Sequence, residues 1–224
     1  MKTMRALPIA LAVFLLSTST MFAQDLSKYR DFSLGMHLAD VAKRIDKTAA
    51  DARLIQQDPA MIQELTWWPT QSYQASARVE PVEEAVFSFY SGALYKIAVS
   101  YNSTSTHGLT AADMTKALSA EYGVASRPVT KGASTDNAGY SNTPKTIAFW
   151  QDARYYVTLV RSPVSEDFQL VISSKQMTGQ AEAAIAAAAT QAVKNAPQIE
   201  IARAKQEAED LETTRQANLK AFRP

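Results

Sequence analysis

Histidine is the first residue type to consider for chemistry, and the chain contains two, His37 and His107. A protein zinc site needs three or four convergent histidine, cysteine or carboxylate ligands. The chain has no cysteine, and its histidines do not form a His-x-x-x-His pair. We therefore expect no metal site, and we interpret His37 as an imperfect helix cap.

Carboxylates could serve a hydrolase, because a glycosidase needs only two of them at a suitable separation. Glu83 and Glu84 are the obvious pair, but neighbouring residues of a strand point to opposite faces of its sheet. Serines and aspartates abound, yet no G-x-S-x-G motif accompanies them, and no phosphate-binding G-x-x-x-x-G-K-[ST] or G-x-G-x-x-G motif occurs. The sequence predicts neither an enzyme nor a cofactor. An exported hydrolase with an unrecognised carboxylate or serine site is the alternative.

Aromatic residues are more informative. Trp67 and Trp68 are neighbours, so an extended backbone directs one indole to each face. Phe87 and Phe89 belong to a segment with apolar residues on both faces, which needs cover on both because bare apolar area costs about 25 cal/mol per Å². We interpret these four residues as a candidate protein-binding surface. Cover by the C-terminal helices or the long loops is the competing interpretation.

Two amphipathic helices should support the predicted sheet. The first follows His37, and its apolar face is predicted to contain Leu38, Val41, Ala42 and Ile45. The second follows Thr110, a good N-cap residue, with Asp113 in the first turn and Gly123 as the stop. The two helices indicate that one unit is used twice.

Two hairpins strengthen this interpretation. Residues 87–99 and 147–159 align in their aromatic and branched positions, and each predicts two strands joined by a two-residue turn, Ser91-Gly92 in the first and Gln151-Asp152 in the second. Further strands are predicted at 53–56, 64–68 and 168–173. The pattern favours a tandem helix-plus-hairpin repeat over residues 33–101 and 106–174.

The domain organisation follows from these elements. Residues 24–176 predict an α+β domain, a two-layer antiparallel sheet with helices on one face. Residues 177–224 are rich in alanine, glutamate and glutamine and predict a helical tail broken near Pro197. A solvated tail is the preferred interpretation, and a self-associating helical scaffold is another alternative.

The first 23 residues resemble a secretory signal peptide. Lys2 and Arg5 precede the apolar run 6–16, which is followed by mostly small residues up to Ala23. The apolar run would extend only about 16 Å as a helix, too short to span a bilayer. We expect cleavage after Ala23 and an exported protein, periplasmic or extracellular. A lipoprotein is not expected, because the chain has no cysteine.

Charge narrows the range of partners. The formal net charge of the chain is +1, whereas nucleic-acid binding requires a clustered basic excess. No apolar stretch after the signal approaches the length of a membrane span. We expect another envelope or secreted protein as partner, neither nucleic acid nor a membrane, and the oligomeric state stays open.

The stretch FSLGMHLADVAKRI, residues 32–45, carries a resemblance. It is similar to the first helix of β-lactamase-inhibitor-like proteins and of small outer-membrane assembly lipoproteins (SmpA/OmlA type), in which Leu-Gly-Met precedes a capped helix. The first group is also built from tandem helix-plus-sheet repeats. The whole chain resembles an uncharacterised family of exported bacterial α+β proteins. The resemblance implies a fold and a compartment, and no activity.

Overall fold

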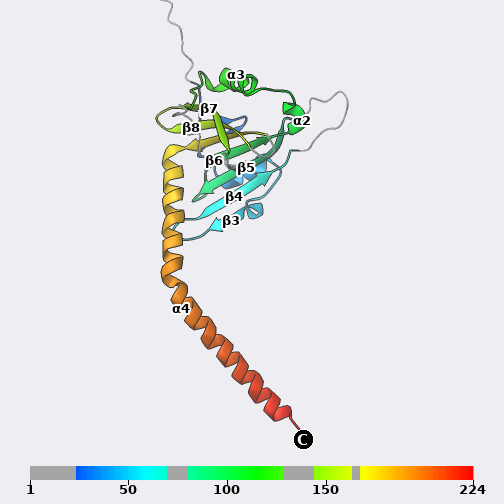
Figure 1. The fold of residues 1–224 in the computed structure, drawn as a ribbon, viewed down its shortest axis with the longest axis vertical. Coiled ribbons are helices and arrows are strands. Elements are labelled where there is room, and N and C mark those ends of the chain that lie inside the picture. Colours follow the sequence, from blue (N-terminus) through cyan, green and yellow to red (C-terminus); the bar gives the residue numbers. More distant parts are fainter. Residues whose placement is uncertain (1–23, 70–79, 129–143, 163–166, 224) are drawn as a thin grey trace, which may run out of the picture.

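The computed structural model describes residues 24–69, 80–128, 144–162 and 167–223 and has an α+β fold (Figure 1). The expected signal segment, residues 1–23, lies outside the described residues. Strands of the main sheet are β3 (Arg53–Gln56), β4 (Ile62–Trp67), β5 (Val82–Tyr90), β6 (Ala93–Tyr101), β7 (Lys145–Gln151), β8 (Tyr155–Arg161) and β9 (Phe168–Ser174). The remaining elements are a small hairpin of β1 (Lys28–Tyr29) and β2 (Phe32–Ser33), the helices α1 (Leu38–Arg44), α2 (Ser103–Thr106), α3 (Ala111–Tyr122) and α4 (Lys175–Ala221), and a 3-10 turn, η1 (Ala49–Asp51). The expected fold class is confirmed.

The seven strands form one antiparallel sheet with the order β3-β4-β5-β6-β9-β8-β7. About the boundary between β6 and β9, the strands β4, β5 and β6, which follow α1, correspond in order to β7, β8 and β9, which follow α3, and β3 is an additional edge strand. The symmetry matches β4–β5 with β7–β8, whereas the sequence similarity matches β5–β6 with β7–β8. Duplication of residues 33–101 and 106–174 stays a prediction, and the topology favours a strand correspondence shifted by one.

One face of the sheet, the covered face, holds the main core. The small hairpin, α1 and α3 contribute Phe32, Val41 and Met114 to it. Alternate strand residues point to this face and are fully buried, among them Leu65, Phe87, Phe89, Ile97, Val99, Val157, Leu159, Leu170 and Ile172. Burying a side chain of this size contributes about 1.5–3 kcal/mol, so these residues account for much of the fold's stability.

Local capping chemistry positions the two helices of the covered face. Thr110 Oγ1 accepts the Asp113 N–H at 3.2 Å and Asp113 Oδ2 accepts the Thr110 N–H at 2.9 Å, which is a capping box. Gly123 ends α3 with φ 87°. His37 occupies the N-cap position of α1 but makes no side-chain capping bond. Both helix starts are therefore where the sequence predicts them, and only the second is fully capped.

The two predicted hairpin turns differ. Ser91 and Gly92 both have positive φ, 48° and 82°, as a two-residue type I′ turn requires. In the second hairpin Gln151 belongs to β7, and the turn spans residues 152–154. Asp152 Oδ1 accepts the N–H groups of Arg154 and Tyr155, which stabilises the longer turn. The predicted two-residue turn at Gln151-Asp152 is therefore wrong, because the hydrogen bonds of the Asp152 side chain stabilise a longer turn.

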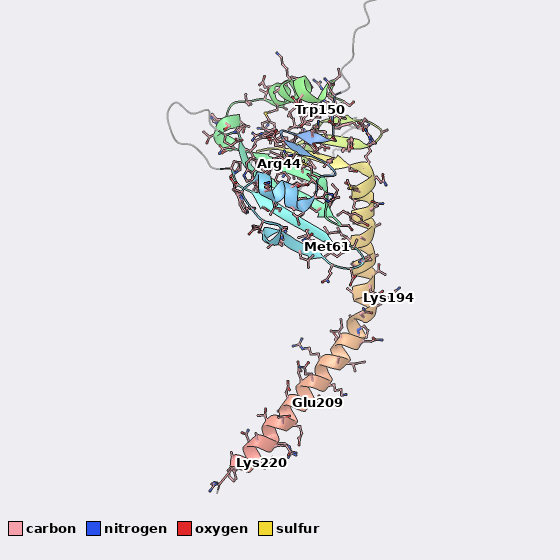
Figure 2. All side chains as sticks on the ribbon, turned by 180° about the vertical axis from the view of Figure 1, so that it is seen from behind. Arg44, Met61, Trp150, Lys194, Glu209 and Lys220 are labelled. Atoms are coloured by element: carbon pink, nitrogen blue, oxygen red, sulfur yellow. The ribbon has the colours of Figure 1, made fainter. Side chains whose placement is uncertain are left out.

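The C-terminal tail is a single helix of 47 residues, and the predicted break at Pro197 is wrong. Proline removes one intrahelical hydrogen bond and clashes with the preceding turn, which bends a helix that flanking residues still favour. Figure 2 shows that α4 changes direction close to Lys194 and then projects away from the sheet. The strong helix formers on both sides of Pro197 explain why the helix continues.

Candidate binding surface

The second face of the sheet, called the open face here, is incompletely covered. Its central side chains are half-buried: Val86, Ala98, Thr158, Val160 and Val171. Their neighbours on the covered face, such as Phe87 and Val99, are 0% exposed. Because these positions alternate along the same strands, the difference reflects what packs on each face and not the strands themselves.

The first turns of α4 cover one end of the open face. Ala181 packs with Ile62 and Tyr95, and Met177 contacts the same cluster. Burial raises the pKa of the Tyr95 phenol. From Ile185, which is 45% exposed, the side chains of α4 are solvent-exposed except for half-buried Ala188. The helix therefore supplies a partial second cover, which leaves the other end of the strands open.

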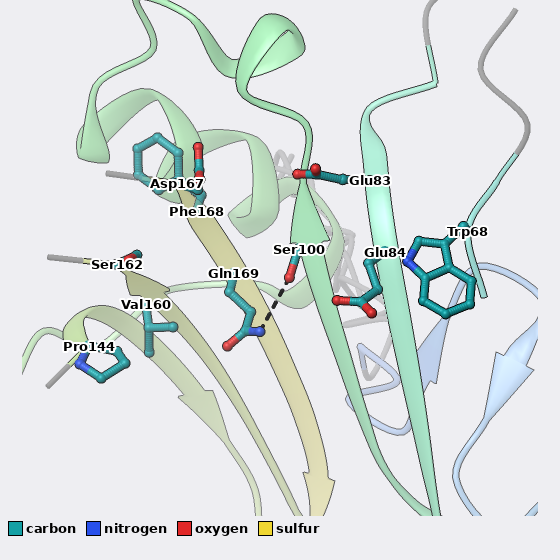
Figure 3. A pocket seen from close by; sticks show the side chains of 10 residues that line it. All are labelled: Trp68, Glu83, Glu84, Ser100, Pro144, Val160, Ser162, Asp167, Phe168 and Gln169. Atoms are coloured by element: carbon teal, nitrogen blue, oxygen red, sulfur yellow. Dashed lines mark hydrogen bonds between the residues drawn. The ribbon is translucent and has the colours of Figure 1, made fainter. Parts of the chain in front are cut away.

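A groove of about 460 Å³ lies at that other end (Figure 3). Its lining residues are Trp68, Glu83, Glu84, Ser100, Pro144, Val160, Ser162, Asp167, Phe168 and Gln169. Gln169 Nε2 donates a hydrogen bond to Ser100 Oγ across β6 and β9 at 3.4 Å. Among the lining residues that the structure describes, three are carboxylates and none is basic, while Lys47 and Arg161 lie against the rings of Trp68 and Phe168 at the rim.

A β-bulge brings Glu83 and Glu84 to the same groove, which corrects the prediction that they face opposite sides. Val82 pairs with Tyr101 and Glu84 pairs with Ser100, so Glu83 is the extra residue of β5. A bulge places two residues opposite one and redirects the side chains locally. Glu83 is exposed and Glu84 is half-buried.

The four predicted surface residues do not lie together. Phe87 and Phe89 are 0% exposed on the covered face, and their assignment to a binding surface is corrected, because α1 and the small hairpin bury that face. Trp67 is half-buried, with its ring centroid 6.1 Å from that of Phe32. Trp68 is 61% exposed and lines the groove, with Lys47 Nζ 5.3 Å from its ring centroid.

Sequence reasoning missed Ser100, Asp167 and Gln169. A signal was present, because Ser100 and Gln169 are polar residues in alternating apolar strands, and each lies at one end of its strand. Their proximity depends on the β6–β9 pairing, in which Ser100 faces Gln169. Residues 69 positions apart become neighbours through that pairing alone.

A second groove, of about 500 Å³, adjoins the first through Asp167 and Phe168 and includes His107. The guanidinium carbon of Arg161 lies 5.1 Å from the centroid of the Phe168 ring between the two grooves. Within residues 24–69, 80–128, 144–162 and 167–223, no three histidine or carboxylate side chains converge as metal ligands would.

The comparisons with known proteins found no relative of this chain. No family model matches the chain, and neither a curated protein nor a solved structure matches it. Among the helices of the described residues, none is both long and apolar enough to cross a bilayer. Inference about function therefore depends on the open face and its groove.

Proposed function

We propose that this chain is a non-enzymatic exported module that binds another protein through the open face and the groove. The main observation behind this proposal is that Val86, Ala98 and Val171 are only half-buried and that Trp68 beside them is exposed. The helix α4 covers only the opposite end of the open face. A broad, shallow face with apolar centre, polar rim and an aromatic side chain suits a protein segment.

The groove suggests the chemistry of the partner. Glu83, Glu84 and Asp167 line the same groove, and none of its described lining residues is basic, so a cationic segment would be attracted. Exposed Trp68 could pack on the aliphatic stem of a lysine or arginine. The basic, apolar and small segments within residues 1–23, together with the resemblance to exported proteins, support an envelope or secreted partner.

A photo-crosslinking residue in place of Ala98, at the centre of the open face, tests this proposal. We expect it to capture a protein in the envelope fraction, and we expect the same crosslinker at exposed Leu54 on β3 to capture none. Adding Trp68→Ala and Glu84→Gln should reduce the crosslink about tenfold. A folded Ala98 variant that captures nothing would contradict the proposal.

Hydrolysis is the second candidate, and the bulge is the specific observation that favours it, because it brings Glu83 and Glu84 into one groove. The test is turnover of glycoside, ester and peptide substrates by the full chain, compared with Glu83→Gln and Glu84→Gln. Removing a required carboxylate should lower the rate at least 100-fold. Equal background rates in all three proteins would eliminate this candidate.

A further inference from the structure

Large exposed apolar side chains concentrate on the C-terminal helix. Of the exposed large hydrophobic residues in the described parts of the chain, those on α4 and at its C-cap are Ile185, Val193, Ile199, Ile201, Leu211, Leu219 and Phe222. Past Pro197 the helix, here called the arm (residues 198–221), is exposed throughout and projects from the sheet (Figures 1 and 2). Exposed apolar groups gathered on one element indicate an interaction surface.

Most of these residues form a single stripe. At about 100° per residue, Ile201, Leu211, Leu219 and Phe222 fall within an arc of about 80°. Ala204 and Ala208 lie in the same arc and would let another backbone approach closely. Ile199, at 62% exposure, lies on the opposite side of the arm and is not part of the stripe. The exposed apolar side chains of the arm therefore gather mainly on one side, and Arg215 lies within the same arc.

We propose that the arm pairs antiparallel with the arm of a second copy of this chain, stripe against stripe. In this arrangement Ala208 faces Leu211 of the second copy on both sides of the two-fold axis. The stem of Arg215 then lies over Ala204 of the second copy, with its charged end directed to solvent. An isologous pairing of this kind closes as a dimer and leaves the open face available.

Charge complementarity selects the occupant and the orientation. Lys205 and Glu212 lie on one flank of the stripe, and Glu200 and Glu207 lie on the other. Antiparallel arms bring equal flanks together, so Lys205 faces Glu212 of the second copy twice, while the Glu207 side chains of the two copies share the other flank. Parallel arms would pair Lys205 with Glu200 of the second copy, but they would also place Glu207 beside Glu212 and stack Arg215 on its equivalent. The balance of these charges favours the antiparallel direction.

The contact is narrow, because one stripe of a helix about 36 Å long buries less than the roughly 1,200 Å² of a standard interface. We expect a reversible dimer whose mass falls on dilution. Sedimentation equilibrium of the full chain from about 1 µM to about 1 mM measures this association. A measured mass equal to that of one chain over the whole concentration range would overturn the proposal.

Matched substitutions locate the interface. Leu211→Glu at the centre of the stripe should weaken the dimer at least about tenfold, and Ile199→Glu, the same kind of change on the opposite side, should leave it unchanged. The proposed interface would be overturned if both substitutions weakened the dimer equally, or if Leu211→Glu did not weaken it. Lys205→Glu and Glu212→Lys should each weaken the dimer, and the double variant should restore it. Circular dichroism checks that every variant keeps its helix.

Orientation has a separate readout, since the chain contains no native cysteine. Ile201→Cys chains mixed with Asn218→Cys chains should form a disulfide between copies under mild oxidation. Ile201→Cys chains alone should not, because antiparallel arms hold the two positions about 26 Å apart along the axis. Disulfide dimers from Ile201→Cys alone would overturn the antiparallel arrangement.

Discussion

At the scale of single residues, the Arg30–Glu80 pair connects the small hairpin to the segment before β5. Arg30 Nη2 and Nη1 donate to the two Glu80 oxygens at 2.7 and 3.3 Å, and Glu80 Oε1 also accepts the Val82 N–H at 3.0 Å. Burial opposes ionisation of Glu80, but these bonds outweigh it and hold the pKa of the carboxyl below the usual 4.5.

This arrangement predicts a pH dependence of stability. Because the folded pKa of Glu80 is depressed, its contribution is present above pH 4.5 and is lost as the pH falls through the folded pKa. Urea unfolding at neutral and acidic pH measures the effect, which we expect to be about 1 kcal/mol for a partly exposed, bidentate pair. Glu80→Gln should remove this part of the acid sensitivity, and an unchanged acid slope would contradict the assignment.

Phe87 shows how burial decides a residue's role. It is 0% exposed, with its ring centroid 4.6 Å from that of Phe32. Phe87→Ala should lower the free energy of unfolding by about 3–5 kcal/mol, because it removes buried area and leaves a cavity. Trp68→Ala, at an exposed aromatic position, should change it by less than about 0.5 kcal/mol. Similar costs in chemical denaturation would contradict the placement of the two residues.

At the scale of elements, the two helix N-termini form a natural comparison. Thr110 donates its hydroxyl to Asp113 Oδ2 at 2.6 Å and accepts the Asp113 N–H, whereas His37 makes no side-chain cap. Thr110→Ala should therefore destabilise the protein by about 1 kcal/mol, and His37→Ala should cost much less. Thermal unfolding of both variants measures this difference, and equal losses of stability would contradict the predicted advantage of the capping box over the His37 cap.

The bend in α4 also belongs to this scale. Pro197 lies inside the helix, where proline is about 3 kcal/mol less favourable than alanine. Pro197→Ala should increase helical content in far-UV circular dichroism, since it restores one N–H donor and removes a steric clash. The unfolding midpoint of the sheet should not change, because the side chains of α4 around Pro197 are exposed. A shift in that midpoint would indicate that the bend supports the core.

At the scale of the whole molecule, stability should be distributed unevenly. The central strands β6 and β9 are paired on both sides and carry fully buried residues such as Ile97 and Ile172. Their amides should exchange with deuterium most slowly, and those of the arm most rapidly in dilute protein, where the proposed dimer would be dissociated. Hydrogen-exchange mass spectrometry measures the order. The predicted order would be contradicted if the amides of the arm were as protected from exchange as those of β6 at every protein concentration.

Features that depend on a few neighbouring residues were predictable from the sequence. The N-cap at Thr110, the stop at Gly123 and the Ser91-Gly92 turn depend on side chains within one turn of the backbone. Alternating apolar residues likewise predicted the strands and the α+β class. These features depend on local sequence, so they can be predicted without knowing which residues pack against them.

Only the tertiary structure decided which face each aromatic residue occupies. Phe87 is in the core and Trp68 is exposed, although both are large aromatic residues in or beside strands. The difference arises because α1 and the small hairpin cover one face, while α4 covers only one end of the other. The bulge at Glu83 and the β6–β9 pairing that brings Ser100 to Gln169 are likewise set by contacts between distant segments. Burial depends on how the helices pack on the two faces of the sheet, so the candidate site could be identified only from the tertiary structure.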